Sequence, residues 1–309
     1  MKNIYEVQSA NKRKSFIVMA AFVVFITIAV YFVSQAFAIY MGYRAGGLGI
    51  AGIALIFSGL TSIGSYYFSD KIVLGISGAR PADRRRDFEF FTVAENLSMA
   101  AGLPKPRLYV IEDTAMNAFA TGRNPEHAVI VATTGLLAQL KRTELEGVIG
   151  HELTHIKNYD ILLMSLVSVL VGTVALLGDF FLRAQWYGGG RRSNDRDSSA
   201  GIIMLVGILF AILSPIIGTL IQLAISRRRE FSADAGAVYI TRQPDGLISA
   251  LQKINNDHEP LEAANKATAH LYIENPFKNK IGDARANFAG LFNTHPPVEE
   301  RLKALREMR

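Results

Sequence analysis

The chain has 309 residues, of which half are hydrophobic and only 19% are charged, whereas soluble globular proteins carry about 25% charged residues. The net charge of +6 comes from basic residues that flank apolar stretches instead of forming one patch, which argues against a nucleic-acid partner. The absence of cysteine excludes disulfides, thiolate nucleophiles and cysteine-rich metal sites, so that histidines and carboxylates must hold any metal.

The first part of the chain contains two long apolar runs. Residues 16–40 follow a cluster of basic residues and are numerous enough to cross a hydrocarbon core about 30 Å thick at 1.5 Å per residue. A cleaved secretory signal is the alternative, because residues 36–38 read Ala-Phe-Ala, but its apolar core would have only about 7–15 residues. Residues 48–68 form the second run. We therefore predict a transmembrane hairpin over 1–70, with its basic flanks on the cytoplasmic side.

A more polar stretch follows, and it reads as soluble structure. Its pattern predicts a helix over 82–101 that ends at Gly102 and Pro104. It also predicts three strands, at 107–111, 117–121 and 128–132. Residues 71–160 are thus expected to form the first part of an α+β domain that contains a small sheet.

Two further apolar runs, at 161–182 and 200–225, predict a second pair of hydrophobic helices over 161–226. The connector between them is Gly-rich and more basic than an outside loop should be, so a helical pair that dips into the membrane or packs on the soluble domain is the alternative. Residues 227–309 are polar, mostly helical in pattern, and complete the soluble domain. Within them, residues 275–293 match no chemistry.

The residues around position 150 have the spacing of a metal site. Thr143 and Glu146 have capping-box spacing, which predicts the start of a helix. His151 and His155 are four residues apart, so both imidazoles lie on one helical face and can reach one ion. Glu152 lies beside the first histidine, where its carboxylate can take a proton from a zinc-activated water.

A third ligand is expected from a separate segment, since a catalytic zinc has three protein ligands and one open position. Glu230 and Asp234 are again four residues apart, directly after the fourth apolar run. We predict that Glu230 is the third ligand and that Asp234 accepts a hydrogen bond from a ligating histidine, His151 in the first instance. A helix that merely begins with acidic residues is the alternative.

Together these residues resemble the HtpX-type integral membrane zinc metalloproteases, which are relatives of the CAAX prenyl endopeptidases. The resemblance rests on four motifs in the family's order: Asn117–Gly122, His151–His155 with Asp160 beyond it, Glu230–Asp234, and Thr294–Pro297. It implies a mainly α-helical membrane protein, with about four hydrophobic helices and a zincin-like α+β catalytic domain with a small sheet.

The resemblance also implies roles for individual residues. It implies one zinc ion per chain, although imidazole and carboxylate ligands would also accept Mn²⁺ or Co²⁺. It places Asn117 on an edge strand beside the cleft, where a substrate chain can add as a further strand. His295 and Arg301 match positions that stabilise the oxyanion of a tetrahedral intermediate, for which alternative roles are a helix cap and a surface residue.

The implied activity is that of an endopeptidase in the bacterial inner (cytoplasmic) membrane, with its catalytic domain facing the cytosol. Its implied role is quality control and stress response, in which it cleaves misfolded or damaged membrane proteins or other unfolded polypeptides at the lipid bilayer. A prenyl-protein endopeptidase is the alternative enzyme, but four apolar runs are fewer than an enclosed chamber requires. An inactive membrane scaffold is disfavoured because every ionisable group that the reaction needs is present.

Overall fold

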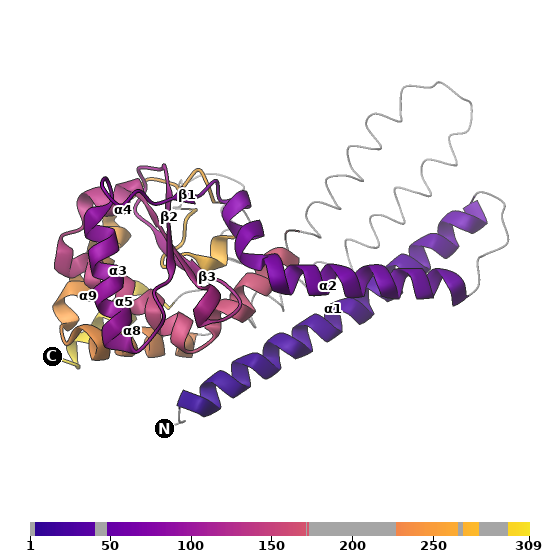
Figure 1. The fold of residues 1–309 in the computed structure, drawn as a ribbon, viewed down its shortest axis with the longest axis horizontal. Helices are drawn as coiled ribbons and strands as arrows, with labels where there is room; N and C mark the ends of the chain where they lie inside the picture. The colour runs from indigo at the N-terminus through magenta and orange to yellow at the C-terminus, as the bar shows by residue number, and fades with distance from the viewer. Residues whose placement is uncertain (1–3, 41–47, 171, 173–226, 265–267, 278–295) are drawn as a thin grey trace, which may run out of the picture.

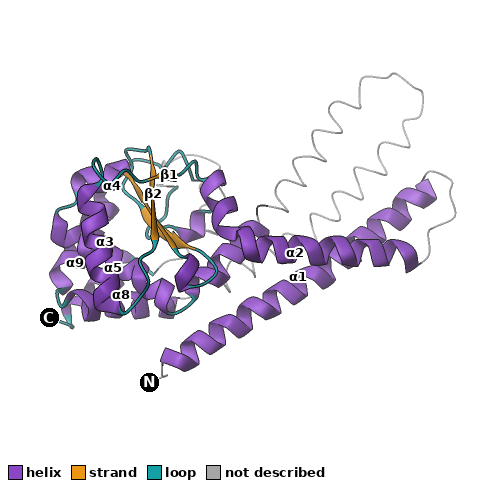
Figure 2. Cartoon of the chain, in the orientation of Figure 1, coloured by secondary structure: helices purple, strands orange, loops and turns teal. Residues whose placement is uncertain are grey.

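The computed structural model describes residues 4–40, 48–170, 172, 227–264, 268–277 and 296–309. Two long helices project from a part of the molecule in which shorter helices surround a small sheet (Figures 1 and 2). The described part of the chain is mostly helical, with one mixed four-stranded sheet. This agrees with the predicted α+β domain.

The two projecting helices, α1 (Ile4–Tyr40) and α2 (Leu48–Ile76), pack against each other. Small hydroxyl side chains lie between them, and the hydroxyls of Thr27 on α1 and Ser58 on α2 are 3.0 Å apart. Many large apolar side chains are exposed instead, although Phe22 on α1 and Val73 on α2 are buried. Among the described residues, none of the helices combines the length and the apolar character needed to cross a membrane. The spans predicted at 16–40 and 48–68 therefore stay predictions.

The sheet contains four strands in the order β1-β2-β4-β3. They are β1 (Arg80–Pro81), β2 (Arg107–Ile111), β3 (Ala118–Thr121) and β4 (Val129–Thr133). β2 and β4 run parallel, whereas β1 and β3 pair antiparallel to them at the two edges. The three predicted strands are confirmed to within one residue at each end. The two-residue β1 carries no periodic signal and was not predicted.

Both faces of the sheet are covered, which explains why every residue of β4 is buried. On one face, Ile130 and its neighbours pack against α3 (Phe88–Ala101), α5 (Arg142–Lys157) and α9 (Pro244–Asn256). On the other face, Phe119 and Val131 pack against the C-terminal end of α2 and against Met164, Leu261 and Tyr272. The sheet therefore joins the projecting helices to the helical layer behind it.

Helix α3 begins at Phe88, six residues later than predicted, although it ends at Ala101 as expected. Residues 83–87 form a turn instead, because the carboxylate of Asp83 accepts hydrogen bonds from the backbone N–H groups of Arg85 and Arg86. At the other end, Gly102 adopts a left-handed conformation with φ of 67°, which closes the helix.

The start of α5 also differs from the prediction. The helix begins at Arg142, and the backbone N–H of Lys141 donates to the Glu144 carboxylate at 2.7 Å, so the pair Thr143–Glu146 does not cap it. The reason is tertiary: Glu144 also accepts from Ser249 and Lys253 on α9, which holds it at the helix start. Glu146 pairs with Arg142 on the surface.

Helix α5 is closely packed on two sides, against α9 and against α8 (Arg227–Thr241). A methyl group on Gly147 would lie 2.6 Å from the backbone nitrogen of Leu247, and one on Gly236 would lie 2.4 Å from the Thr154 side chain. Glycine is needed at both positions because the helices approach each other this closely. The packing fixes α8, and with it Glu230, relative to α5.

The remaining described elements are short. They are the 3-10 helices η1 (Pro125–His127) and η2 (Ala269–Leu271) and the helices α4 (Thr134–Gln139) and α11 (Val298–Arg306). After a turn at Asn158 and Tyr159, a further helix continues over residues 160–170. The rest of the predicted run 161–182, the run 200–225 and most of 275–293 lie outside the described residues.

Candidate metal centre

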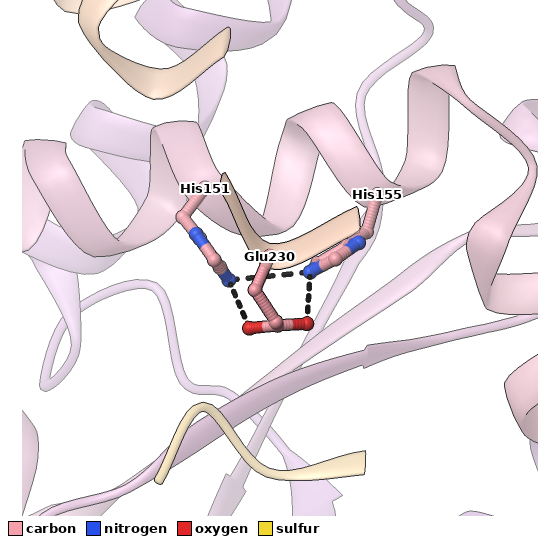
Figure 3. A group of neighbouring side chains, drawn as sticks. All are labelled: His151, His155 and Glu230. Carbon is pink, nitrogen blue, oxygen red and sulfur yellow. Dashed lines mark hydrogen bonds and ion pairs between the residues drawn. The ribbon is translucent and has the colours of Figure 1, made fainter. Parts of the chain in front are cut away.

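His151 and His155 lie on consecutive turns of α5, and their side chains point in the same direction (Figure 3). Their Nε2 atoms are 3.2 Å apart. Both residues are at most 4% exposed. The four-residue spacing in the sequence therefore brings both nitrogens to one place, as predicted.

Glu230, in the first turn of α8, completes the group. Its two carboxylate oxygens face the two imidazoles, with Oε2 at 3.6 Å from His151 Nε2 and Oε1 at 3.5 Å from His155 Nε2 (Figure 3). Two ligand atoms bound to one zinc at tetrahedral angles are roughly 3.3–3.4 Å apart. The three observed distances lie on either side of that value, so these residues fit a metal ion by both spacing and donor type.

A second carboxylate lies behind each histidine. Asp234 Oδ1 is 2.9 Å from His151 Nδ1, and Asp160 Oδ2 is 3.0 Å from His155 Nδ1. An ionised carboxylate only accepts hydrogen bonds, so both Nδ1 atoms carry a proton and both Nε2 atoms face the centre. The predicted contact between Asp234 and His151 is confirmed. Asp160, which the sequence motif included without a role, has the equivalent position at His155.

Arg301, on α11, is completely buried, and two of its nitrogens donate hydrogen bonds to Asp234. Its Nε and Nη2 donate to the two Asp234 oxygens at 2.9 and 2.7 Å, and its Nη1 donates to the backbone oxygen of Ile273 at 3.2 Å. Nη1 is also 3.9 Å from Glu230 Oε2. The guanidinium thus lies behind the histidine that it supports and connects the C-terminal helix to the centre.

The charges around the centre shift the pKa values of its groups in different directions. Burial, together with the repulsion of neighbouring cations, lowers the pKa of His151 despite its bond to Asp234. Burial also acts to lower the pKa of His155, but the hydrogen bond that His155 donates to Asp160 and the charges of Glu230 and Glu152 outweigh it and raise this pKa to about 9. Burial would raise the pKa of Asp234, yet Arg301 lowers it to about 2. The excess negative charge near His155 would also attract a cation.

Glu152 follows His151 directly on α5 and is 2% exposed. Its negative charge contributes to the raised pKa of His155. A buried carboxylate beside a metal position can accept and return a proton during catalysis. The role of Glu152 as the general base stays a prediction.

Asn117 immediately precedes the edge strand β3, but its side chain is only 1% exposed. Its Nδ2 donates to the backbone oxygen of Glu274 at 3.0 Å, and the backbone N–H of Ile273 donates to the oxygen of Ala118 at 2.9 Å. β3 is an edge strand, and Asn117 lies just before its first residue. The backbone of Ile273 and Glu274 already contacts this end of the edge.

His295 lies outside the described residues, so the structure does not place it. Sequence reasoning gave no role to Asp160 and did not single out Asn11, whose amide contacts Asp160. A carboxylate five residues beyond the second histidine was a usable signal for Asp160, because a short turn can bring it back to the ring. Asn11 carries no such signal, since 149 residues separate it from its partner.

Comparisons with known proteins agree with this geometry. Residues 85–309 match the model of peptidase family M48. A protease HtpX homolog of Caldanaerobacter subterraneus is 43% identical over 311 residues, covering 99% of this chain and 98% of the relative. A homolog of Streptococcus uberis is 39% identical, covering 99% of this chain and all of the relative. In fold, the chain resembles a crystal structure of S. mikatae Ste24p, with a TM-score of 0.50 and 19% identity, over 97% of this chain and 67% of that one.

Proposed function

Because this chain belongs to peptidase family M48, whose members are metalloproteases, we propose that it is a zinc-dependent endopeptidase acting on misfolded or damaged membrane proteins. The observation that carries the proposal is the convergence of His151, His155 and Glu230 on one point, each with a ligand atom suited to zinc. With one zinc per chain, this set leaves the fourth coordination position open to water or substrate.

The catalytic chemistry is divided between the ion and the residues around it. A zinc ion held by these three ligands supplies a Lewis acid, which lowers the pKa of a water and polarises a carbonyl. Glu152 is the general base, which accepts a proton from the attacking water and passes it to the leaving amine. Asp234 and Asp160 keep both Nδ1 atoms protonated, so that His151 and His155 present Nε2 to the centre.

Arg301 was predicted to stabilise the oxyanion, but its contacts favour a positioning role. Three of its nitrogens already donate to Asp234 and Ile273, and it has no exposed surface from which to reach a substrate. We therefore assign it the task of holding Asp234, and through Asp234 the ring of His151. The oxyanion contact is assigned to His295, which remains a proposal from the sequence.

The outward-facing apolar side chains of α1 and α2 support a membrane location. Several are more than half exposed, including Phe16, Val24, Ile56 and Leu60, while Ser58, Ser62, Ser65 and Ser69 are buried. Interfaces between helices in lipid are typically built from such small residues, because lipid solvates the large apolar ones. We propose that the hairpin lies in the inner membrane, with the metal centre on the cytosolic side near the bilayer surface.

We propose that the substrate chain adds to the outer edge of β3. The backbone N–H of Thr133 donates to the oxygen of Asn117, and the N–H of Asn117 donates to Thr133 Oγ1. The alternation of the antiparallel pair then turns the backbone groups of Ala118 and Ala120 away from β4. Ile273 contacts Ala118, which leaves Ala120 as the pairing position nearer the end of the strand. Methylating one backbone nitrogen of a peptide substrate at the paired position should raise KM about fivefold, as expected for one lost hydrogen bond. Equal KM values for every methylated position would exclude this binding mode.

The main test compares cleavage of casein by the detergent-purified wild-type protein and by Glu152→Gln, each with zinc and with a chelator. We expect chelation to stop cleavage by the wild type. Glu152→Gln should bind zinc at one ion per chain but cleave about 100- to 10,000-fold more slowly, since it retains the ligands and loses the base. Glu146→Gln is the matched control, because Glu146 lies on the same helix and pairs with Arg142 at the surface.

Each other outcome has a definite meaning. If the wild type binds no metal, or if Glu152→Gln cleaves as fast as Glu146→Gln, the proposed mechanism is wrong. If the wild type binds zinc and cleaves a prenylated peptide but not casein, the prenyl-protein endopeptidase replaces the proposed substrate class.

A further inference from the structure

The first turns of α1 lie against the turn that follows the metal-binding helix. Gln8 Nε2 donates to the backbone oxygen of Lys157 at 2.7 Å, and Asn11 Nδ2 donates to the backbone oxygen of Asn158 at 2.9 Å. The ammonium of Lys12 is 4.0 Å from the centre of the Tyr159 ring. Three consecutive residues of the turn are thus held by a helix about 150 positions away in the sequence.

The turn itself is backbone-strained at Tyr159, whose φ of 59° lies in the left-handed region that residues with a Cβ rarely adopt. This residue lies between the end of α5 and the helix over 160–170. Asp160 follows it directly, and its Oδ2 lies 3.0 Å from His155 Nδ1 on α5. The orientation of His155 therefore depends on a turn that requires support from outside.

Asn11 supplies that support to Asp160 directly. Its Nδ2 is 2.8 Å from Asp160 Oδ1, the carboxylate oxygen that His155 does not use. Since an amide nitrogen has two hydrogens, the contacts with Asn158 and Asp160 account for both of them. Arg229 on α8 contributes a longer contact, with Nε 3.4 Å from the same oxygen. Asn11 and Asp160 are both almost fully buried.

We propose that Asn11 is a positioning residue of the metal centre, which fixes Asp160 and through it the tautomer and ring orientation of His155. This inference rests on the proposed function, because it assumes that His155 binds the metal. It makes the N-terminal helix part of the catalytic apparatus. A displacement of α1 is transmitted to the metal through two side-chain contacts, from Asn11 to Asp160 and from Asp160 to His155.

Gln8 provides a matched control. It lies one turn before Asn11 on the same face of α1 and also donates to the turn, but its partner is a backbone oxygen and not the Asp160 carboxylate. If α1 only docks against the domain, the loss of either side chain should have similar consequences. If Asn11 positions Asp160, only the loss of Asn11 should change the metal centre.

The experiment uses full-length protein in detergent and compares wild type, Asn11→Ala and Gln8→Ala. Zinc affinity is measured by competition with a chromophoric chelator, and the Co²⁺-substituted proteins are compared by visible absorption. Removing residues that support metal ligands typically costs about 10- to 100-fold in affinity. We expect about 10-fold for Asn11→Ala with a shifted Co²⁺ spectrum, and less than about twofold with an unchanged spectrum for Gln8→Ala.

A second variant, Asn11→Asp, covers the case in which Asn11→Ala does not fold. It keeps the size of the side chain but places a carboxylate beside Asp160, so the loss of zinc affinity should exceed that of Asn11→Ala. Wild-type affinity and spectrum in the Asn11 variants would overturn the inference, as would equal losses for Asn11→Ala and Gln8→Ala. In either case a wild type that binds zinc and cleaves casein would leave the proposed function intact. A wild type without zinc would refute both.

Discussion

The hairpin of α1 and α2 and the domain around the sheet distribute their side chains in opposite ways. In the domain, residues such as Phe119 and Ile130 are fully buried. In the hairpin, Ile56 and Leu60 are about two-thirds exposed while serines occupy the contact between the helices. The domain follows the arrangement that water imposes, in which apolar surface is removed from the solvent.

The two regions also differ in where they place charged groups. The domain buries Glu152, Glu230, Asp234 and Arg301 almost completely, and their partners lie within the same group of helices. Burying such charges is tolerated only with compensation, which is why they cluster where the metal is proposed to bind. The hairpin instead has a hydroxyl contact between its helices, and both helices make polar contacts where they meet the domain, as Asn11 on α1 does with Asp160 and Asp70 on α2 does with Arg107. The domain thus suits water and the hairpin suits lipid. The following substitutions test this difference.

The largest effect is expected at Arg301. Arg301→Met would leave the Asp234 carboxylate buried without its charge partner, so we expect the free energy of unfolding to fall by about 3–5 kcal/mol. Arg306→Met on the same helix is the control, because Arg306 is exposed and its loss should be nearly neutral. Chemical denaturation of the two variants measures the difference. Equal stability would show that the buried pair contributes nothing to the domain.

The second prediction places the same charge on each region. Ile56 on α2 and Met99 on α3 are 66% and 73% exposed. If the hairpin lies in lipid, Ile56→Lys should oppose insertion by about 2.5–3.5 kcal/mol, whereas Met99→Lys faces water and should be neutral. The fraction of each variant that resists alkaline extraction from membranes is the measurement. The same extraction behaviour for both variants would argue against a lipid-facing hairpin.

The third prediction adds one methyl group to each region. Gly147→Ala would place a methyl 2.6 Å from the backbone of Leu247, so α5 and α9 must separate at a cost of about 1–3 kcal/mol. Gly64→Ala on α2 meets nothing within 4 Å and should instead stabilise its helix slightly, by about 0.5–1 kcal/mol. Thermal unfolding followed by circular dichroism distinguishes them. A Gly147→Ala protein as stable as wild type would contradict the close packing of α5.

The smallest effect concerns Glu144 and depends on pH. Burial acts to raise its pKa, but hydrogen bonds from Lys253, Ser249 and the Lys141 backbone outweigh it and lower the pKa below the ordinary value of 4.5. The folded state therefore binds this proton less readily than the unfolded state, and the stabilisation is present above pH 4.5 and is lost as the pH falls through the lowered value.

Comparing Glu144→Gln with wild type tests this. At neutral pH the variant should be about 1–2 kcal/mol less stable, as expected for hydrogen bonds to a charged group, and the difference should shrink as the pH falls below 4.5. Glu146→Gln, which removes an exposed pair with Arg142, should cost less than about 0.5 kcal/mol. A difference between Glu144→Gln and wild type that does not depend on pH would contradict the lowered pKa.

Much of the catalytic domain was accessible from local sequence. Short apolar runs bounded by turn residues located β2, β3 and β4. The spacing of His151 and His155, and that of Glu230 and Asp234, gave the candidate ligands. The strands and the histidine pair are predictable because one strand or one helix determines each of them. The predicted start of α5 was wrong because it depends on contacts with another helix. Ser249 and Lys253 on α9 hold the glutamate that closes the first turn of α5.

The sequence by itself determined that two histidines share a helical face, that a base lies beside them, and that a carboxylate pair follows on another helix. These are consequences of helical periodicity, which depends only on neighbouring residues. Only the tertiary structure decided which groups hold the carboxylates behind the two histidines. Arg301 reaches Asp234, and Asn11 reaches Asp160, because packing joins helices that are distant in the chain. No local pattern encodes such contacts, since their spacing in the sequence reflects the path of the chain and not the geometry of the site.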